Sequence, residues 1–264
     1  MIVDYHMHLR AQDESIEHTV ETVERFVGQA AERGIDEIGF TEHIYYFEQT
    51  RPLWSMPYHL ERCAYDIEPY VDAVLESKRR GHPVKLGIEV DYERGREEET
   101  AEALAPYPWD YVLGSIHFLD GLAIDAEPSL VDSVGSEQAW RRYYVALGQA
   151  AQSGLFDSLA HPDLVKFHGP EIEWDWDEVA GSLEGVAIEV SSAGLHKPHG
   201  KLYPNPAFLA AVRDRGLPIT LASDAHIPQN VGRDLDRAID HARGAGYETV
   251  TLFDQREPRQ ELLG

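Results

Sequence analysis

The sequence predicts an α/β protein in which parallel strands and helical crossovers close into a barrel. Short β-branched or aromatic runs alternate along the chain with segments of helical periodicity, and seven or eight such units suggest a closed barrel rather than an open sheet. The 264 residues suit one α/β barrel, which commonly takes about 250. Hydrophobic residues make up 43%, enough for a sizeable core. We therefore expect a single domain over residues 1–264.

The elements follow from periodicity and from turn residues. The first strand is expected at about 1–6, and a helix at about 15–33 carries Val20, Val23 and Val27 on one face and ends at Gly34. Further strands are expected at about 36–41, 84–92, 109–116, 157–161, 185–191, 218–223 and 247–252. Further helices are expected at about 59–79, 96–105, 136–153, from about 175, 205–215 and 229–243. The stretches 118–135 and 192–204 are rich in Gly and Pro and are expected to be loops.

Composition narrows the function classes. The formal net charge of −24 repels nucleic acid phosphates, so a large nucleic-acid-binding face is disfavoured. No apolar run approaches the roughly 20 residues that span a bilayer, and no dinucleotide or P-loop motif occurs. The lone Cys63 has helical apolar neighbours, which indicates a packed thiol in a reducing compartment. We expect a cytoplasmic protein without a membrane partner, and its oligomeric state stays open.

Imidazoles and carboxylates gather at the expected strand ends. Residues two apart on a strand point the same way, so His6 and His8 face one side together, as do Asp224 and His226. Side chains at the C-terminal ends of parallel strands converge in a closed barrel. The candidate metal ligands are His6, His8, His43, Glu89, His117, His161, Asp224 and His226. A shell so rich in histidine favours zinc, iron or manganese over magnesium.

Six motifs around these residues resemble a known family. They are Asp4-Tyr5-His6-Met7-His8, Thr41-Glu42-His43, Gly87-Ile88-Glu89-Val90-Asp91-Tyr92, Gly114-Ser115-Ile116-His117, Ala160-His161-Pro162-Asp163 and Ser223-Asp224-Ala225-His226. In this order and spacing they resemble the polymerase and histidinol phosphatase (PHP) family, in particular its histidinol-phosphatase branch. The resemblance implies a distorted (βα)7 barrel with two or three divalent metal ions at the C-terminal ends of the strands.

The resemblance also implies how the ligands are shared. His6, His8, Glu89 and Asp224 would hold one metal, and Glu89 would bridge to a second held by His117 and His161. A third would be held by His43, His226 and a residue of the loop after His8. The family places a histidine in that loop, where this chain offers Asp13, then Glu14, then His18, in that order of preference. His18 falls in the expected helix, which favours a surface role for it.

Substrate binding is assigned to the loop after Ser192-Ala193-Gly194-Leu195. Histidinol-phosphatase relatives carry arginine there, whereas this chain has His196, Lys197 and Lys201, which we expect to bind a phosphate. Lys166 and His168 are further candidates. Asp4, Glu42 and Asp163 either orient imidazoles or cap their strands. His59, His82 and His241 look like residues of helix surfaces or turns.

The expected activity is hydrolysis of a small phosphomonoester, with histidinol phosphate, an intermediate of histidine biosynthesis, as the first choice of substrate. A hydroxide that bridges two metals would attack phosphorus, and Asp224, His226 or a metal-bound water would protonate the leaving oxygen. The main alternative is another PHP-family phosphoesterase, that is, a nucleotide or sugar phosphatase or a nuclease. An amide or lactone hydrolase and a silent phosphate-binding module are further alternatives.

Overall fold

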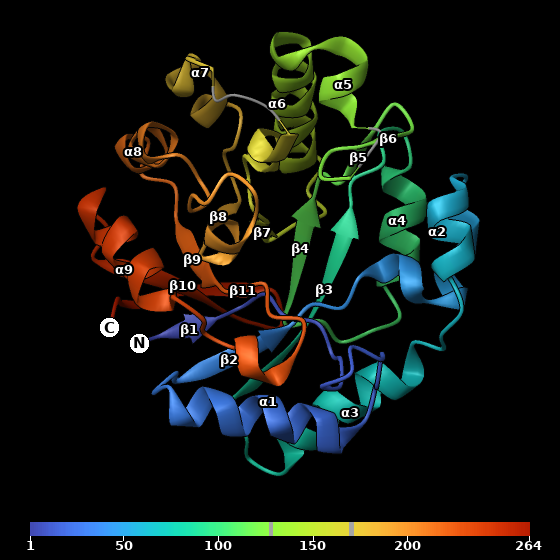
Figure 1. The fold of residues 1–264 in the computed structure, drawn as a ribbon. Helices are drawn as coiled ribbons and strands as arrows, with labels where there is room; N and C mark the ends of the chain where they lie inside the picture. The colour runs from blue at the N-terminus through green and yellow to red at the C-terminus, as the bar shows by residue number, and fades with distance from the viewer. Residues whose placement is uncertain (127–128, 169–171) are drawn as a thin grey trace.

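The computed structural model describes residues 1–126, 129–168 and 172–264, and its centre is a parallel sheet of seven strands (Figure 1). In spatial order the strands are β1 (Val3–Asp4), β2 (Glu37–Phe40), β3 (Val84–Asp91), β4 (Tyr111–Ser115), β7 (Ser158–Leu159), β8 (Ala187–Ser191) and β9 (Ile219–Ala222). The edge strands approach each other, because the Tyr5 amide donates to Leu221 at 2.9 Å and the His8 amide to Ala225 at 2.8 Å. The sheet is thus a nearly closed barrel, and the predicted distorted (βα)7 fold is confirmed.

Helices surround this barrel on the outside (Figure 1). They are α1 (Val20–Glu32), α2 (Pro57–Arg62), α3 (Glu68–Arg79), α4 (Glu97–Leu104), α5 (Leu130–Val134), α6 (Ser136–Gln152), α7 (Trp176–Gly181), α8 (Pro206–Asp214) and α9 (Leu235–Gly244). Short 3₁₀ turns are η1 (Ile44–Tyr46), η2 (Glu48–Leu53), η3 (Leu164–His168), η4 (Ala193–His196) and η5 (Pro228–Asn230). Helix α1 begins later than expected because the Thr19 side chain caps it and accepts from the Thr22 amide at 3.2 Å.

Aromatic rings fill the barrel interior. The ring of Tyr111 stacks on Tyr5 at 5.1 Å and on Phe253 at 5.5 Å between ring centres, and its hydroxyl donates to the Tyr5 carbonyl at 2.7 Å. A Cβ added at Gly39 or Gly87 would run into this ring. The two glycines on β2 and β3 therefore make room for a tyrosine from β4, which fixes how these strands pack together.

Three expected elements differ in the structure. The strand expected at 247–252 is β10 (Thr249–Asp254), which pairs antiparallel with β11 (Glu257–Leu262) outside the barrel sheet. The hairpin turn holds Gln255 and Arg256 at φ 51° and 66°, so it lacks the glycine or asparagine by which such turns are usually recognised. The helix expected at 59–79 is two helices, α2 and α3. The expected loop 118–135 contains a small hairpin of β5 (Phe118–Leu119) and β6 (Leu122–Ala123), as well as α5.

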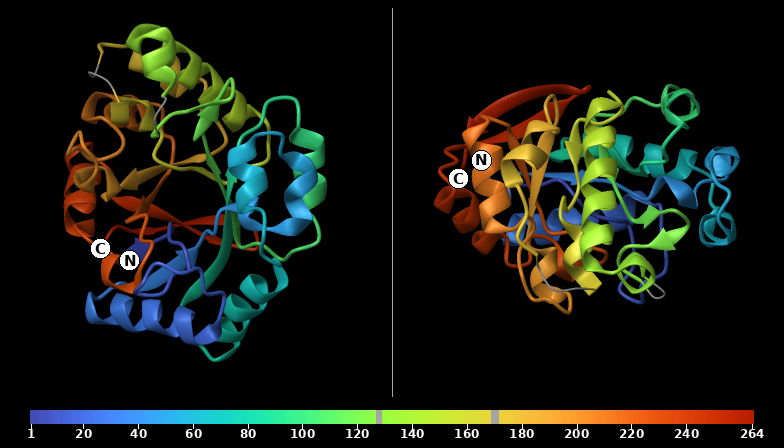
Figure 2. Two further views of the ribbon diagram at one scale, coloured as in Figure 1. Left: turned by 45° about the vertical axis from the view of Figure 1, so that its right-hand side comes forward. Right: turned by 90° about the horizontal axis from the view of Figure 1, so that it is seen from above.

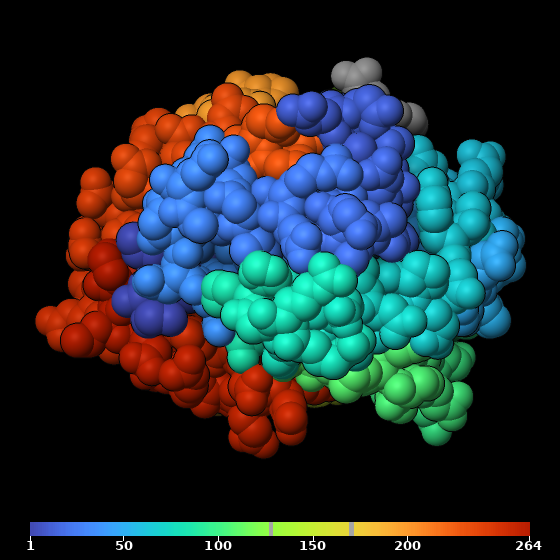
Figure 3. Space-filling view, turned by 90° about the horizontal axis from the view of Figure 1, so that it is seen from below, coloured from blue at the N-terminus to red at the C-terminus, as the bar shows by residue number. Residues whose placement is uncertain are grey.

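The chain ends lie side by side in both panels of Figure 2. The N-terminal amine donates to the Leu262 carbonyl at 2.6 Å, and the Gly264 amide donates to Met1 at 3.0 Å. The C-terminal hairpin, red in Figure 3, lies beside the N-terminal segments on the lower face. In the described ranges, no helix is both long and apolar enough to cross a membrane. The expectation of a single domain over 1–264 stays a prediction.

Candidate metal centre

Eight side chains from six strands meet at the C-terminal end of the barrel. Each belongs to at least one group of three whose donor atoms lie within 4.8 Å of one another. The eight are His6, His8, His43, Glu89, His117, His161, Asp224 and His226. Two of them, His161 and Asp224, have left-handed backbone conformations with φ 25° and 52°. Such conformations are costly outside glycine and concentrate at functional sites.

The first group of donors has the dimensions of a metal shell. The Nε2 atom of His6 lies 3.4 Å from Glu89 Oε2 and 3.6 Å from Asp224 Oδ1, and Nε2 of His8 lies 3.6 and 3.5 Å from the same two oxygens. Metal–ligand distances of about 2.0–2.2 Å in a tetrahedron give edges of about 3.3–3.6 Å between ligands. We therefore assign these four atoms to site 1.

The second group lies on the other oxygen of the same carboxylate. Glu89 Oε1 is 3.6 Å from His117 Nε2 and 3.4 Å from His161 Nε2. We call this group site 2. Because Oε2 faces site 1 and Oε1 faces site 2, Glu89 has the arrangement of a carboxylate that bridges two cations.

Several of these donor atoms lack a partner among the described residues. Nε2 of His6, Nε2 of His8 and Oε1 of Glu89 are buried and accept or donate no hydrogen bond. Buried polar atoms are nearly always paired, so two unpaired atoms that face site 1 and one that faces site 2 require an explanation. A divalent cation supplies it, and the imidazole and carboxylate set fits zinc, iron or manganese.

The two acids and two of the imidazoles are in the protonation state that metal binding requires. Burial would raise the pKa of Glu89 and Asp224, but the surrounding imidazoles outweigh it and hold both pKa values well below the usual range. Burial lowers the pKa of His43, and burial with His8 lowers the pKa of His226 to about 3. The acids are therefore anions and these two imidazoles are neutral, which is the state in which both kinds of group donate to a metal. Burial would lower the pKa of His6, His8 and His117, but neighbouring carboxylates outweigh it and raise these pKa values, so a metal would displace protons from these three rings.

Carboxylates behind the cluster orient the ligating rings. Glu189 Oε2 lies 2.8 Å from His6 Nδ1, Glu42 Oε1 lies 3.2 Å from His8 Nδ1, and Asp91 Oδ1 lies 2.7 Å from His117 Nδ1. Each contact holds Nδ1 and turns Nε2 towards the centre. Of the three carboxylates proposed from sequence, only Glu42 has this role. Asp4 accepts from Ser223 and from the Gly232 amide, and Asp163 accepts from Lys166 at 2.8 Å.

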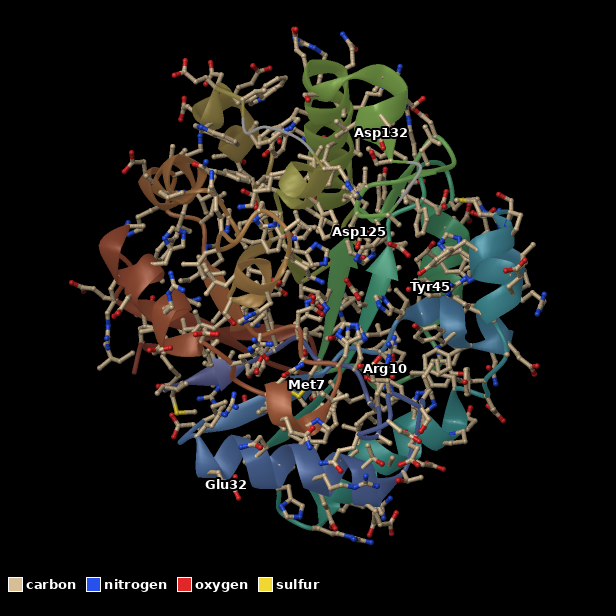
Figure 4. All side chains as sticks on the ribbon, viewed as in Figure 1. Met7, Arg10, Glu32, Tyr45, Asp125 and Asp132 are labelled. Carbon is tan, nitrogen blue, oxygen red and sulfur yellow. The ribbon has the colours of Figure 1, made fainter. Side chains whose placement is uncertain are left out.

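A cavity of about 180 Å³ opens above the donors. Figure 4 labels three of its lining residues: Arg10 in the loop after β1, Tyr45 in η1 and Asp125 after β6. The lining residues are Arg10, His43, Tyr45, Tyr46, Tyr58, Glu89, His117, Phe118, Asp125, His161, Lys197, Asp224 and His226. The cavity thus has a floor of metal donors, two cationic side chains and an aromatic wall.

The expected third-metal ligands lie elsewhere. Asp13 is exposed, and its carboxylate accepts from the amide and hydroxyl of Ser15 at 3.1 and 2.7 Å within its own turn. Glu14 is also exposed. His18 precedes α1 rather than lying in it, and its Nε2 is 3.2 Å from Glu42 Oε2. Hydrogen bonds within the loop after His8 set the direction of its side chains, and the order of residues alone did not indicate that direction.

Only one of the expected phosphate-binding residues lines the cavity. Lys197 does, whereas His196 lies 2.8 Å from the Asp234 carboxylate and Lys201 lines a separate surface depression. Lys166 is buried and donates to Asp163 and to the Leu202 carbonyl. His168 is absent from the lining. The 3₁₀ turn η4 directs successive side chains to different sides, so adjacency in sequence does not place them together.

Four residues around the site are not among those predicted from the sequence. Glu189 is an acid inside the apolar strand Ala187–Ser191, and Asp91 lies two residues after Glu89 on the same strand face. Both signals were readable from the sequence. Arg10 had none. His59, expected on a helix surface or in a turn, is fully buried, and its Nε2 lies 3.6 Å from Asp91 Oδ2.

Comparisons with known proteins agree with this geometry. A probable histidinol-phosphatase of Deinococcus radiodurans is 33% identical over 244 residues, which cover 89% of this chain and 92% of that protein. The histidinol-phosphatase of Lactococcus lactis is 22% identical over 95% of this chain and 94% of its own. A crystal structure of the Lactococcus lactis histidinol phosphate phosphatase, complexed with zinc, L-histidinol and phosphate, matches with a TM-score of 0.75 at 20% identity and covers 98% of each chain, which shows the shared fold.

The family model named PHP domain matches residues 4–193. That range spans more than two thirds of the chain and contains six of the eight clustered donors, from His6 to His161. The remaining two, Asp224 and His226, complete the cluster from β9. The chain belongs to the PHP domain family.

Proposed function

We propose that this protein is a metal-dependent phosphomonoester hydrolase whose substrate is histidinol phosphate. The observation that carries the proposal is the division of the Glu89 oxygens between two sets of donors on the floor of a cavity that also holds Arg10 and Lys197. Two metals bridged by a carboxylate stabilise both oxygens of an in-line displacement at phosphorus. The D. radiodurans, L. lactis and further relatives named as histidinol-phosphatases support the choice of substrate.

Different side chains of the cavity would hold the metals, supply positive charge and transfer protons. Metals bound at sites 1 and 2 would neutralise the phosphoryl oxygens and lower the pKa of water in the cavity. Arg10 and Lys197 place positive charge beside the same space. Asp224 and His226 are the proposed pair for proton transfer, since Asp224 Oδ1 lies 3.6 Å from His226 Nδ1 at the cavity edge. Burial and His8 lower the pKa of His226, so it is a neutral acceptor that would take the proton of the attacking water and return it to the leaving oxygen.

The cavity suits a small organic phosphate. Its volume of about 180 Å³ suits a monoester better than a polymer, and the formal net charge of −24 repels nucleic acid. Asp125 offers a carboxylate to a cationic amine, and Tyr45, Tyr58 and Phe118 offer faces to a flat ring. Histidinol phosphate has both groups. The single cysteine is a buried free thiol, which supports the cytoplasm as the location.

A panel of phosphate esters tests the proposal. The metal-replete protein would be assayed with histidinol phosphate, p-nitrophenyl phosphate, a sugar phosphate, a nucleoside monophosphate and a single-stranded oligonucleotide. We expect the highest kcat/KM for histidinol phosphate. A higher kcat/KM for the nucleotide or sugar phosphate would transfer the proposal to another phosphatase, and cleavage of the oligonucleotide alone would replace it with a nuclease.

The variant His117→Ala tests whether turnover depends on the metal at site 2. His117→Ala removes one of two imidazoles from Glu89 Oε1, so we expect loss of bound metal and of turnover in a folded protein. His82→Ala is the matched control, because this partly exposed histidine lies outside the cavity near Glu24. A His117→Ala protein with full activity and a full metal complement would contradict the assignment.

A further inference from the structure

The donors do not extend to a third metal site. In the described part of the chain, the group of donors that contains both His43 and His226 is completed by His8 alone. Nε2 of His8 already faces site 1, and its Nδ1 is held by Glu42. One imidazole nitrogen binds one metal, and the other group that contains His43 is completed by Glu89 and His117, which already belong to sites 1 and 2. His43 and His226 are therefore left without a third donor of their own, one protein ligand fewer than a catalytic zinc takes.

The positively charged side chain of Arg10 lies in the cavity beside His43 and His226. Arg10 follows His8 by two residues along the chain. Its Nη2 donates to the Tyr46 hydroxyl at 2.7 Å, and its guanidinium carbon lies 5.9 Å from the centre of that ring. An anchored positive charge thus lies in the cavity that holds the imidazoles a third metal would need.

The charge around Arg10 leaves it available to a ligand. Among the described residues, Arg10 has no carboxylate within ion-pair distance, and its buried Nε has no hydrogen-bond partner. A guanidinium stays charged at every physiological pH and donates from several N–H groups in a planar fork that fits phosphate. An unpaired, anchored arginine at the edge of a metal cavity is thus suited to bind phosphoryl oxygens.

We propose that this centre holds two metal ions, and that the Arg10 guanidinium replaces the third cation and binds the phosphoryl group of the substrate. The number of metals rests on the donor set alone. The contact with substrate rests on the proposed function as a phosphomonoesterase. Of the two or three metals that the resemblance implies, the third, expected at His43 and His226, would then be absent from this chain.

Metal counting tests the first half without any assay of activity. The purified protein would be stripped, titrated with Zn²⁺ or Mn²⁺ by calorimetry, and measured by elemental analysis and native mass spectrometry. We expect two tightly bound ions per chain for the wild type and for Arg10→Ala. Three tightly bound ions in the wild type, or the loss of one ion in Arg10→Ala, would overturn the proposal.

Kinetics test the second half. We expect Arg10→Ala to lower kcat/KM for p-nitrophenyl phosphate by about 10²-fold, the size typical for one lost donor to a developing oxyanion, with Arg10→Lys in between. Arg79→Ala, an exposed arginine on α3, is the control. Unchanged kcat/KM in Arg10→Ala would overturn the contact. If the wild type binds two metals but hydrolyses no monoester, the proposed function is refuted, and so is the contact between Arg10 and the phosphoryl group. The count of two metals would still hold.

Discussion

The interior of the barrel and its C-terminal mouth are built by the same strands with opposite chemistry. In the interior, the rings of Tyr5, Tyr111 and Phe253 contact one another, and the Tyr111 hydroxyl donates a hydrogen bond to the Tyr5 carbonyl. At the mouth, buried imidazole and carboxylate atoms face one another without partners. Strand β3 serves both: Gly87 makes room for Tyr111, and Glu89, two residues further, bridges the donor groups. The interior stabilises the fold, whereas the mouth gives up stability to keep donors available.

This contrast predicts that mouth variants lose metal and activity while interior variants lose stability. The largest effect is expected for Glu89→Gln, which keeps the shape but removes the bridging anion between sites 1 and 2. We expect both metals to be lost and kcat/KM to fall by at least about 10⁴-fold. Glu98→Gln on the exposed face of α4 is the control. A Glu89→Gln protein that keeps both metals and full activity would contradict the role of Glu89 as a bridge between sites 1 and 2.

The opposite result is expected for the interior. Tyr111→Ala removes a fully buried ring, and we expect the free energy of unfolding to fall by about 3–5 kcal/mol, as for other large aromatic truncations. Tyr111→Phe loses only the hydrogen bond to Tyr5, so about 1 kcal/mol is expected. Denaturant titration measures both, with Tyr65→Ala at an exposed tyrosine as control. Metal content per folded molecule should be unchanged, and its loss in Tyr111→Phe would show that the two regions are not separable.

A smaller effect is expected behind the mouth. Asp91→Asn keeps the size of the side chain but replaces the anion that holds His117 Nδ1 at 2.7 Å. We expect metal affinity at site 2 to fall by about 10–100-fold, the usual consequence of losing a group that orients a ligand. A competition titration with a chromogenic chelator measures this, with Asp66→Asn at an exposed turn as control. Equal affinities for Asp91→Asn and the wild type would assign Asp91 to packing alone.

The smallest effect is a pH dependence of metal binding. Burial disfavours the charged form of His117, but Asp91 and Glu89 outweigh it and raise its pKa to about 10 in the metal-free protein. At neutral pH a metal must therefore displace a proton, so apparent affinity should rise with pH by about tenfold per unit for one proton. Calorimetry in buffers of different ionisation enthalpy counts the released protons. Release of none between pH 6 and 8 would contradict the assignment of His117 as a ligand that is protonated before binding.

The sequence predicted the parts of this molecule that depend on strand ends. All eight clustered donors follow or end buried apolar runs, and the period of two along a strand places pairs such as His6 and His8 on one face. The fold class followed from the same alternation. These features are local, and the closed barrel brings them together regardless of loop detail.

The parts that depend on loop paths could not be predicted in this way. Asp13 was preferred as a ligand, yet its turn points it to Ser15, and Arg10 lines the cavity instead. His196 and Lys201 were grouped with Lys197, but the turn η4 and the chain after it send them to different neighbours. The hairpin turn at Gln255 is formed by residues that rarely take a positive φ. In each case tertiary contacts, rather than local preference, decide the side-chain direction.

The most direct test of the bridged centre is anomalous diffraction from crystals grown with zinc or manganese. The account predicts two strong peaks, one on each side of the Glu89 carboxylate and about 3.5–4 Å apart, with His6 and His8 at one peak and His117 and His161 at the other. A single peak not bound by Glu89, or metal bound only at the protein surface, would contradict it.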